Sequence, residues 1–163
     1  MKLFLCDVDG VLTDAAVFIG ENIELKRFDI QDGLGLFALR REGVKVGWIS
    51  SRPSAATRRR AEELKIDFLC QLKEHKVAVI EKLLAETGLT WDEVCYAGDD
   101  IVDLGALKRA GVAVAVGNAV AEAKALADYV TAARGGYGAV REIAELILKA
   151  QNKWEGVVAE HAA

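Results

Sequence analysis

The sequence has 163 residues, of which 52% are apolar and 28% are charged, and its formal net charge is −4. This length and composition are typical of one soluble globular domain, and the acidic balance without a sustained basic block argues against nucleic acid or an anionic membrane as a partner. No apolar run approaches the roughly 18 residues that a membrane span needs, and the apolar start of the chain is too short for a secretory signal.

Short apolar runs alternate with helical patterns along the chain. Strands are predicted at residues 3–6, 46–49, 66–69, 94–97, 112–116 and 129–131, and helices near 33–42, 55–64, 75–87, 101–110, 119–127 and 139–150. Residues 17–19 and 23–28 flank a Gly-Glu-Asn turn, which predicts a β-hairpin. Near-continuous apolar strands that alternate with helices are typical of a parallel sheet covered on both faces. We therefore expect a doubly wound α/β fold.

The chain is predicted to form a single domain over residues 1–150, with the hairpin as a small insertion at about 15–30 and with no cap domain. Residues 151–163 are predicted to form a C-terminal tail. The three cysteines, Cys6, Cys70 and Cys95, lie in or beside apolar strand-like runs and lack metal-type spacing. They are expected to be free thiols, which suits a reducing cytoplasm.

Polar side chains follow several predicted strands at the point where each strand ends. They are Asp7 and Asp9 after the first strand, Ser50 and Arg52 after the second, Lys76 after the third, and Asp99, Asp100 and Asp103 after the fourth. In an open parallel sheet these positions meet at one edge, where ligands bind. Carboxylates at Asp7, Asp9 and Asp99 could share a divalent cation, and oxygen ligands favour Mg²⁺. Asp103, four residues after Asp99, is placed to orient that metal shell.

A single carboxylate after a strand also has a purely structural explanation. An Asp there is often a turn former or a helix N-cap, which applies most to Asp14, Asp29 and Asp32 and less to Asp100. The pair of Asp7 and Asp9 is different, because two neighbouring buried carboxylates repel each other unless a cation or a shared proton offsets them.

Four motifs in order resemble the haloacid dehalogenase superfamily of phosphotransferases: DVDGVLTD at 7–14, ISS at 49–51, Lys76, and GDDIVD at 98–103. The resemblance covers residues 3 to about 150. It implies that Asp7 is the nucleophile and that Asp9 is the general acid and base. It also implies that Ser50 and Lys76 hold the phosphoryl group. Asp99 then binds Mg²⁺ together with Asp7 and the backbone carbonyl of Asp9, and Asp100 and Asp103 surround the metal shell.

The hairpin, RFDIQDGLGL at 27–36 and RGGYGAVRE at 134–142 further resemble the capless 3-deoxy-D-manno-octulosonate (KDO) 8-phosphate phosphatase family. This resemblance implies a Mg²⁺-dependent homotetramer that hydrolyses the terminal phosphate of a 3-deoxy-2-ulosonic acid, with neighbouring hairpins over the site. Arg52 matches the basic position of the KDO branch, and Asp32 in the FDIQDG segment is assigned to substrate binding. Phosphates of KDN or N-acylneuraminate, or a broader set of sugar phosphates, remain alternative substrates.

Some positions depart from the family pattern and leave other interpretations open. Ser51 and Leu72 stand where the family commonly has Gly, and both flank the expected opening of the substrate-binding site. Lys26 and Arg27 of the hairpin are candidates to reach an active site across an interface. A response-regulator receiver fits less well, because its acidic pair and its phosphorylated Asp lie on different strands. An oligomeric scaffold without activity is a further alternative, although every chemical residue is present.

Overall fold

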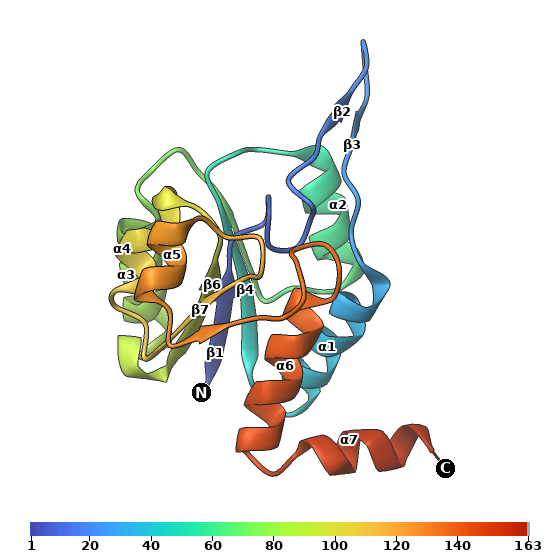
Figure 1. Ribbon diagram of the computed structural model, residues 1–163, viewed down its shortest axis with the longest axis vertical. Coiled ribbons are helices and arrows are strands. Elements are labelled where there is room, and N and C mark those ends of the chain that lie inside the picture. The colour runs from blue at the N-terminus through green and yellow to red at the C-terminus, as the bar shows by residue number, and fades with distance from the viewer. Residues whose placement is uncertain (163) are drawn as a thin grey trace.

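The computed structural model describes residues 1–162 and shows a parallel β-sheet between two layers of helices (Figure 1). The sheet has six strands in the order β5-β4-β1-β6-β7-β8. Their bounds are β1 Leu3–Cys6, β4 Lys45–Ser50, β5 Phe68–Gln71, β6 Val94–Gly98, β7 Val112–Ala115 and β8 Tyr129–Val130. Every neighbouring pair is parallel, so the carboxyl ends of all the strands lie at one edge. The predicted doubly wound α/β fold is confirmed.

The helices cover both faces of the sheet. On one face lie α1 (Ile30–Arg41), α2 (Ala55–Glu63) and α6 (Ala139–Ala150), and on the other lie α3 (Lys76–Thr87), α4 (Leu104–Leu107) and α5 (Ala121–Leu126) (Figure 1). Strand β1 is buried along its whole length between these layers. The apolar character of this run follows from that burial, because each of its side chains faces a helix layer. No helix among residues 1–162 has the length and hydropathy of a membrane span.

Three boundaries differ from the sequence-based expectation for local reasons. Helix α1 begins at Ile30 because the Asp29 carboxylate accepts a hydrogen bond from the Gln31 N–H at 2.8 Å and caps it. Strand β5 begins at Phe68 because Lys65 takes a left-handed turn before it, with φ 54°. The helix expected at 101–110 is split into a 3₁₀ turn, η2 (Ile101–Asp103), and the short α4.

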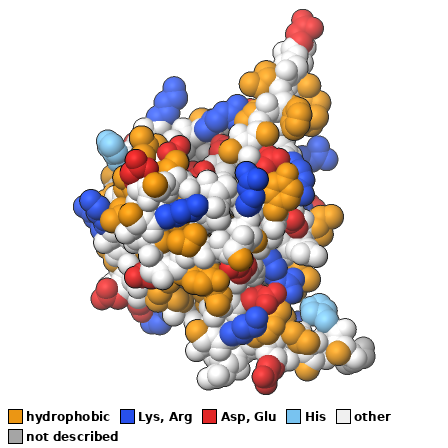
Figure 2. Space-filling view, in the orientation of Figure 1, with side chains coloured by type: hydrophobic (Ala, Val, Ile, Leu, Met, Phe, Trp, Pro, Cys, Tyr) orange, Lys and Arg blue, Asp and Glu red, His pale blue; other side chains and the backbone are white. Residues whose placement is uncertain are grey.

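The hairpin consists of β2 (Phe18–Ile19) and β3 (Glu24–Leu25), which pair antiparallel and are shorter than expected. It projects from the body of the protein at the carboxyl edge of the sheet (Figure 1). Its apolar side chains are exposed, and Figure 2 shows them along the projection; they are Phe18, Ile19, Ile23 and Leu25. Among residues 1–162 nothing resembles a separate cap domain.

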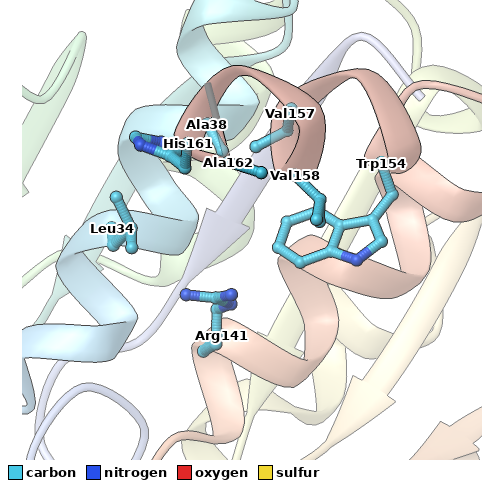
Figure 3. Close-up of a pocket in the computed structure, with 8 residues that line it drawn as sticks. All are labelled: Leu34, Ala38, Arg141, Trp154, Val157, Val158, His161 and Ala162. Carbon is cyan, nitrogen blue, oxygen red and sulfur yellow. The ribbon is translucent and has the colours of Figure 1, made fainter.

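The C-terminal segment contains a further helix, α7 (Trp154–His161), which lies at the opposite end of the molecule from the hairpin (Figure 1). Figure 3 shows Trp154 and Val157 of this helix beside a pocket of about 300 Å³ that also touches Leu34 of α1. The guanidinium of Arg141 on α6 lies 4.9 Å from the centre of the Trp154 ring. Stacking of a cation on this ring and burial of Val157 hold α7 against α6.

Candidate active site

A cleft of about 240 Å³ opens at the carboxyl edge of the sheet, where β1, β4 and β6 end. It is lined by most of the side chains that the sequence pointed to: Asp7, Asp9, Ser50, Arg52, Lys76, Asp99 and Asp100. These residues come from four separate stretches of the chain. The parallel topology brings them together, as expected for ligand sites in open α/β sheets.

Asp7 is the first residue after β1, and its backbone N–H still donates to the Ala97 carbonyl at 3.0 Å. Its carboxylate Oδ1 accepts from the Val8 N–H at 2.7 Å and lies 2.9 Å from the Lys76 ammonium. Both contacts are made by the same oxygen. The second oxygen, Oδ2, accepts from no donor in residues 1–162.

The turn after Asp7 needs glycine. Gly10 has φ 97°, a left-handed conformation, and a Cβ atom there would lie 2.0 Å from Oδ2 of Asp99. Gly135 of the loop 134–138 approaches from the other side, because its Cβ position would lie 1.8 Å from the Gly10 carbonyl oxygen. The turn is therefore packed between Asp99 and that loop, which fixes the direction in which Asp7 and Asp9 point.

Asp103 lies beneath the cleft and is fully buried. Its Oδ1 accepts from the Lys76 ammonium at 2.7 Å and from the Tyr96 hydroxyl at 2.6 Å, and its Oδ2 accepts from the Asp99 N–H at 3.0 Å and the Asp100 N–H at 3.3 Å. An ionised carboxylate has about four lone-pair sites, so these donors fill its capacity. Asp103 therefore orients Lys76 and the backbone of Asp99.

The Lys76 ammonium is buried between two carboxylates. Burial by itself lowers the pKa of Lys76, but the charges of Asp7 and Asp103 outweigh burial and raise that pKa above its ordinary value. Lys76 is therefore a permanent cation at the base of the cleft. It is placed to meet the negative oxygens of a phosphoryl group.

The carboxylates of Asp7 and Asp99 each keep one oxygen without a donor in residues 1–162 and fit a divalent cation, whereas both oxygens of Asp103 are already occupied. Carboxylate oxygens of Asp7, Asp99 and Asp103 lie within 4.8 Å of one another, and Oδ1 of Asp99 is buried without a donor in residues 1–162. Burial raises the pKa of Asp7 to about 6, although Lys76 opposes this shift. Burial, with added repulsion from Asp7 and Asp103, raises the pKa of Asp99 to about 7. A hard cation would offset this repulsion, and the donor set of oxygens alone suits Mg²⁺.

The carboxylate of Asp9 is not part of the cluster that Asp7, Asp99 and Asp103 form. It lies 2.7 Å from the ammonium of Lys26, whose side chain has no exposed surface. The side chain of Asp9 thus does not join the acidic cluster as expected, and its backbone carbonyl is the group left for a metal. Lys26 and Arg27 were candidates to reach a site across an interface. Here Lys26 contacts Asp9 of its own chain, and Arg27 donates to the Gly136 carbonyl of its own chain.

Ser50, Arg52 and Asp100 occupy the expected rim. The Ser50 hydroxyl is buried at the end of β4 and accepts from the Arg52 N–H at 3.1 Å. The guanidinium of Arg52 donates through Nη2 to Glu24 of the hairpin at 2.6 Å, and its buried Nη1 has no partner in residues 1–162. Asp100 caps η2, since its carboxylate accepts from the Ile101 N–H at 2.7 Å.

Asp32, expected to contact substrate, lies instead between α1 and α6. It is 2% exposed, and its Oδ1 accepts from the Arg141 N–H at 2.7 Å. Burial raises the pKa of Asp32 to about 6, and the backbone N–H donors at the start of α6 oppose that shift. The Asp32 carboxylate caps α6 and fixes the loop before it, and its assignment to substrate binding stays a prediction.

Sequence reasoning missed Glu24 and Asn118, and it did not foresee the contact of Lys26 with Asp9 of the same chain. The Nδ2 of Asn118 donates to the Gly10 carbonyl at 3.1 Å, and its Oδ1 accepts from the Gly135 N–H at 2.5 Å. Asn118 follows β7, so its position at the carboxyl end of a strand was a usable signal. For Glu24 and Lys26 the only signal was two charged residues alternating with apolar ones on the hairpin.

Comparison with known proteins places this site in a family. A family of haloacid dehalogenase-like hydrolases matches residues 68–143. The chain is 38% identical to the KDO 8-phosphate phosphatase of Yersinia pestis over 157 residues, which cover 96% of this chain and 84% of that protein. The corresponding enzyme of Escherichia coli K12 is 36% identical over 154 residues, which cover 94% of this chain and 82% of that enzyme.

A solved structure gives the same result. The crystal structure of the KDO 8-phosphate phosphatase from Moraxella catarrhalis, in complex with a magnesium ion, a phosphate ion and a KDO molecule, matches with a TM-score of 0.96 and 41% identity. The match covers 99% of this chain and 93% of that chain. Fold, motif order and sequence identity thus agree: the chain belongs to the KDO 8-phosphate phosphatase family of haloacid dehalogenase-like hydrolases.

Proposed function

We propose that this protein is a Mg²⁺-dependent phosphatase that hydrolyses the terminal phosphate of KDO 8-phosphate. The observation that carries the proposal is the Asp7 carboxylate, held through Oδ1 beside the buried Lys76 and open through Oδ2 toward the cleft. A carboxylate held next to a fixed cation is suited to attack a phosphoryl group, which is itself negatively charged.

In the first step, Oδ2 of Asp7 forms a bond to phosphorus while the bond from phosphorus to the sugar oxygen breaks. Asp9 donates a proton to the departing oxygen. In the second step, a water molecule attacks the aspartyl-phosphate and Asp9 accepts its proton, so that inorganic phosphate leaves and Asp7 is restored. Lys76 and the Ser50 hydroxyl hold the phosphoryl oxygens throughout both steps.

Asp7, Asp99 and the backbone carbonyl of Asp9 are the groups proposed to hold Mg²⁺, supported by the unpartnered Oδ1 of Asp99. When bound, the ion neutralises charge on the transferring phosphoryl group. Asp100 and Asp103 support this shell from the next turn, because Asp103 fixes the backbone of Asp99. The unpartnered Nη1 of Arg52 is placed to bind the acidic or hydroxyl groups of the sugar acid.

A substrate panel tests the proposal. Phosphate release with Mg²⁺ is measured for KDO 8-phosphate, KDN 9-phosphate, N-acetylneuraminate 9-phosphate and simple sugar phosphates. We expect kcat/KM for KDO 8-phosphate to exceed the others at least about tenfold, and chelation of the metal to abolish turnover until Mg²⁺ is restored. Preference for another phosphate would contradict the substrate and the role of Arg52, and turnover in chelator would contradict the metal.

The same proposal includes assembly and location. The protein works as a homotetramer in the cytoplasm, with one domain over residues 1–150 and a tail at 151–163. Support comes from the exposed apolar side chains of the hairpin and from the open cleft, which a neighbouring subunit would shield from water. Light scattering of the purified chain is expected to give four times the monomer mass, and a monomer mass at micromolar concentration would contradict this assembly.

A further inference from the structure

The ammonium of Lys26 occupies an unusual place for a hairpin residue. The side chain has no exposed surface, although the neighbouring hairpin residues are largely open to solvent. Two groups surround the ammonium: Oδ1 of Asp9 at 2.7 Å and the hydroxyl of Thr57, which accepts a hydrogen bond at 3.2 Å. A buried ammonium costs several kcal/mol unless an anion pairs with it, and the carboxylate form of Asp9, which accepts the proton of water in the second step, is that anion.

The hairpin strand that carries Lys26 is held in place by a second contact, which Glu24 makes. Glu24 and Lys26 are two residues apart on an extended chain, so their side chains point the same way. Glu24 accepts hydrogen bonds from Arg52 and from Ser54, the residue that caps α2. Thr57 follows one turn later on α2. The strand is therefore attached to the start of α2 at two points, and the cleft residue Asp9 lies next to the second one.

The contact between Lys26 and Asp9 involves one particular oxygen of the carboxylate. Lys26 lies close to Oδ1 of Asp9, but the two groups are not aligned as a hydrogen bond, so charge attraction holds them. Asp9 also lines the cleft, and its side chain is 23% exposed there. Attraction on one oxygen restricts rotation of the carboxylate, and the other oxygen stays accessible without a hydrogen-bond partner in residues 1–162.

We infer that Lys26 is a positioning residue for Asp9: the hairpin of a chain sets the proton-transfer group in that chain's own cleft. The inference rests on the proposed function, because it concerns the group that would donate and accept the proton. It also gives the hairpin a role within its own subunit, separate from any contact between subunits. Lys26 itself touches neither the nucleophile nor the phosphoryl site.

The test is a pair of Lys to Met substitutions. Lys26→Met keeps an unbranched side chain that is one atom shorter and removes its charge, so kcat is expected to fall at least about tenfold while KM changes less than about threefold. Lys2→Met is the matched control, because Lys2 is exposed and pairs with Glu93 at the opposite edge of the sheet. That control is expected to keep the activity of the unchanged protein.

A double-mutant cycle separates positioning from general support of the fold. If Lys26 acts through Asp9, then adding Lys26→Met to Asp9→Asn should lower single-turnover phosphate release by less than about twofold further. An additional tenfold loss would overturn the inference, and so would an unchanged kcat in Lys26→Met alone. If Lys26→Met does not fold, the same cycle is run with Lys26→Gln, which keeps a polar group facing Thr57.

The cycle is run with both KDO 8-phosphate and p-nitrophenyl phosphate. Hydrolysis of the aryl ester alone by the unchanged protein would contradict the proposed substrate. Because nitrophenolate leaves without needing a proton, the cycle would then test Lys26 through the second step, in which Asp9 accepts the proton of water. An unchanged protein without activity on either ester would overturn both conclusions together.

Discussion

Replacing Asp7 by Asn is expected to lower kcat by at least about 10³-fold, because the variant keeps the shape of the side chain and loses the nucleophilic oxygen. The amide oxygen can still accept from the Val8 N–H and from Lys76, so the cleft should keep its form. Phosphate release measured under single-turnover conditions checks the loss. Mass spectrometry of acid-quenched protein should find a phosphoryl group on the Asp7 peptide of the unchanged chain and none on the variant.

The fold should tolerate this change. Burial raises the pKa of Asp7 to about 6, so its charged form is disfavoured in the metal-free protein. The protonated side chain contributes to stability, and this contribution is lost as the pH rises through that value. The Asn variant has no such loss, and its metal-free unfolding temperature at pH 7 should be no lower than that of the unchanged chain. Asp14→Asn is the control in the same turn, where the carboxylate accepts only from the exposed Ala16 N–H among residues 1–162. A tenth or more of the activity in Asp7→Asn would show that Asp7 is not the nucleophile.

The order of strands and helices was predictable because burial on both faces imposes one kind of sequence. Leu3–Cys6 and Val94–Gly98 are continuous apolar runs, since each lies between two helix layers. The gathering of Asp7, Lys76 and Asp99 followed from the same topology, because parallel strands end at one edge. The chemical role of each residue was predicted from the order of the motifs, because a strand pattern says nothing about chemistry.

Other parts of the site depend on backbone paths that no local pattern defines. Asp32 has the same sequence features as a site residue, and only the packing of α1 against α6 turns its carboxylate toward the Arg141 N–H. The direction of the Asp9 side chain depends on Lys26, which reaches it only because the hairpin lies along α2. These contacts join residues far apart in the chain outside the sheet, where strand register gives no guidance.

Lys76→Met is expected to lower kcat/KM about 10²- to 10³-fold and to destabilise the metal-free protein by about 3 kcal/mol at neutral pH. The ammonium lies 2.9 Å from Asp7 and 2.7 Å from Asp103, and its side chain is 3% exposed. Removing it leaves buried carboxylates without their cation. Phosphate release and chemical unfolding measure the two effects.

The destabilisation should depend on pH in a direction that the carboxylates determine. The pKa of Asp7 and that of Asp99 already lie near 6 and 7 because of burial, and loss of Lys76 removes a cation that lowers both. A raised pKa in the folded state means that stability is lost as the pH rises through it. The difference in unfolding free energy between the variant and the unchanged chain, the gap, should therefore widen from pH 5 to pH 8. Lys82→Met on the same helix, where the ammonium is exposed and pairs with Glu74, should show no such gap. A gap of equal size at both pH values would mean that Lys76 stabilises the fold by packing and not by its charge.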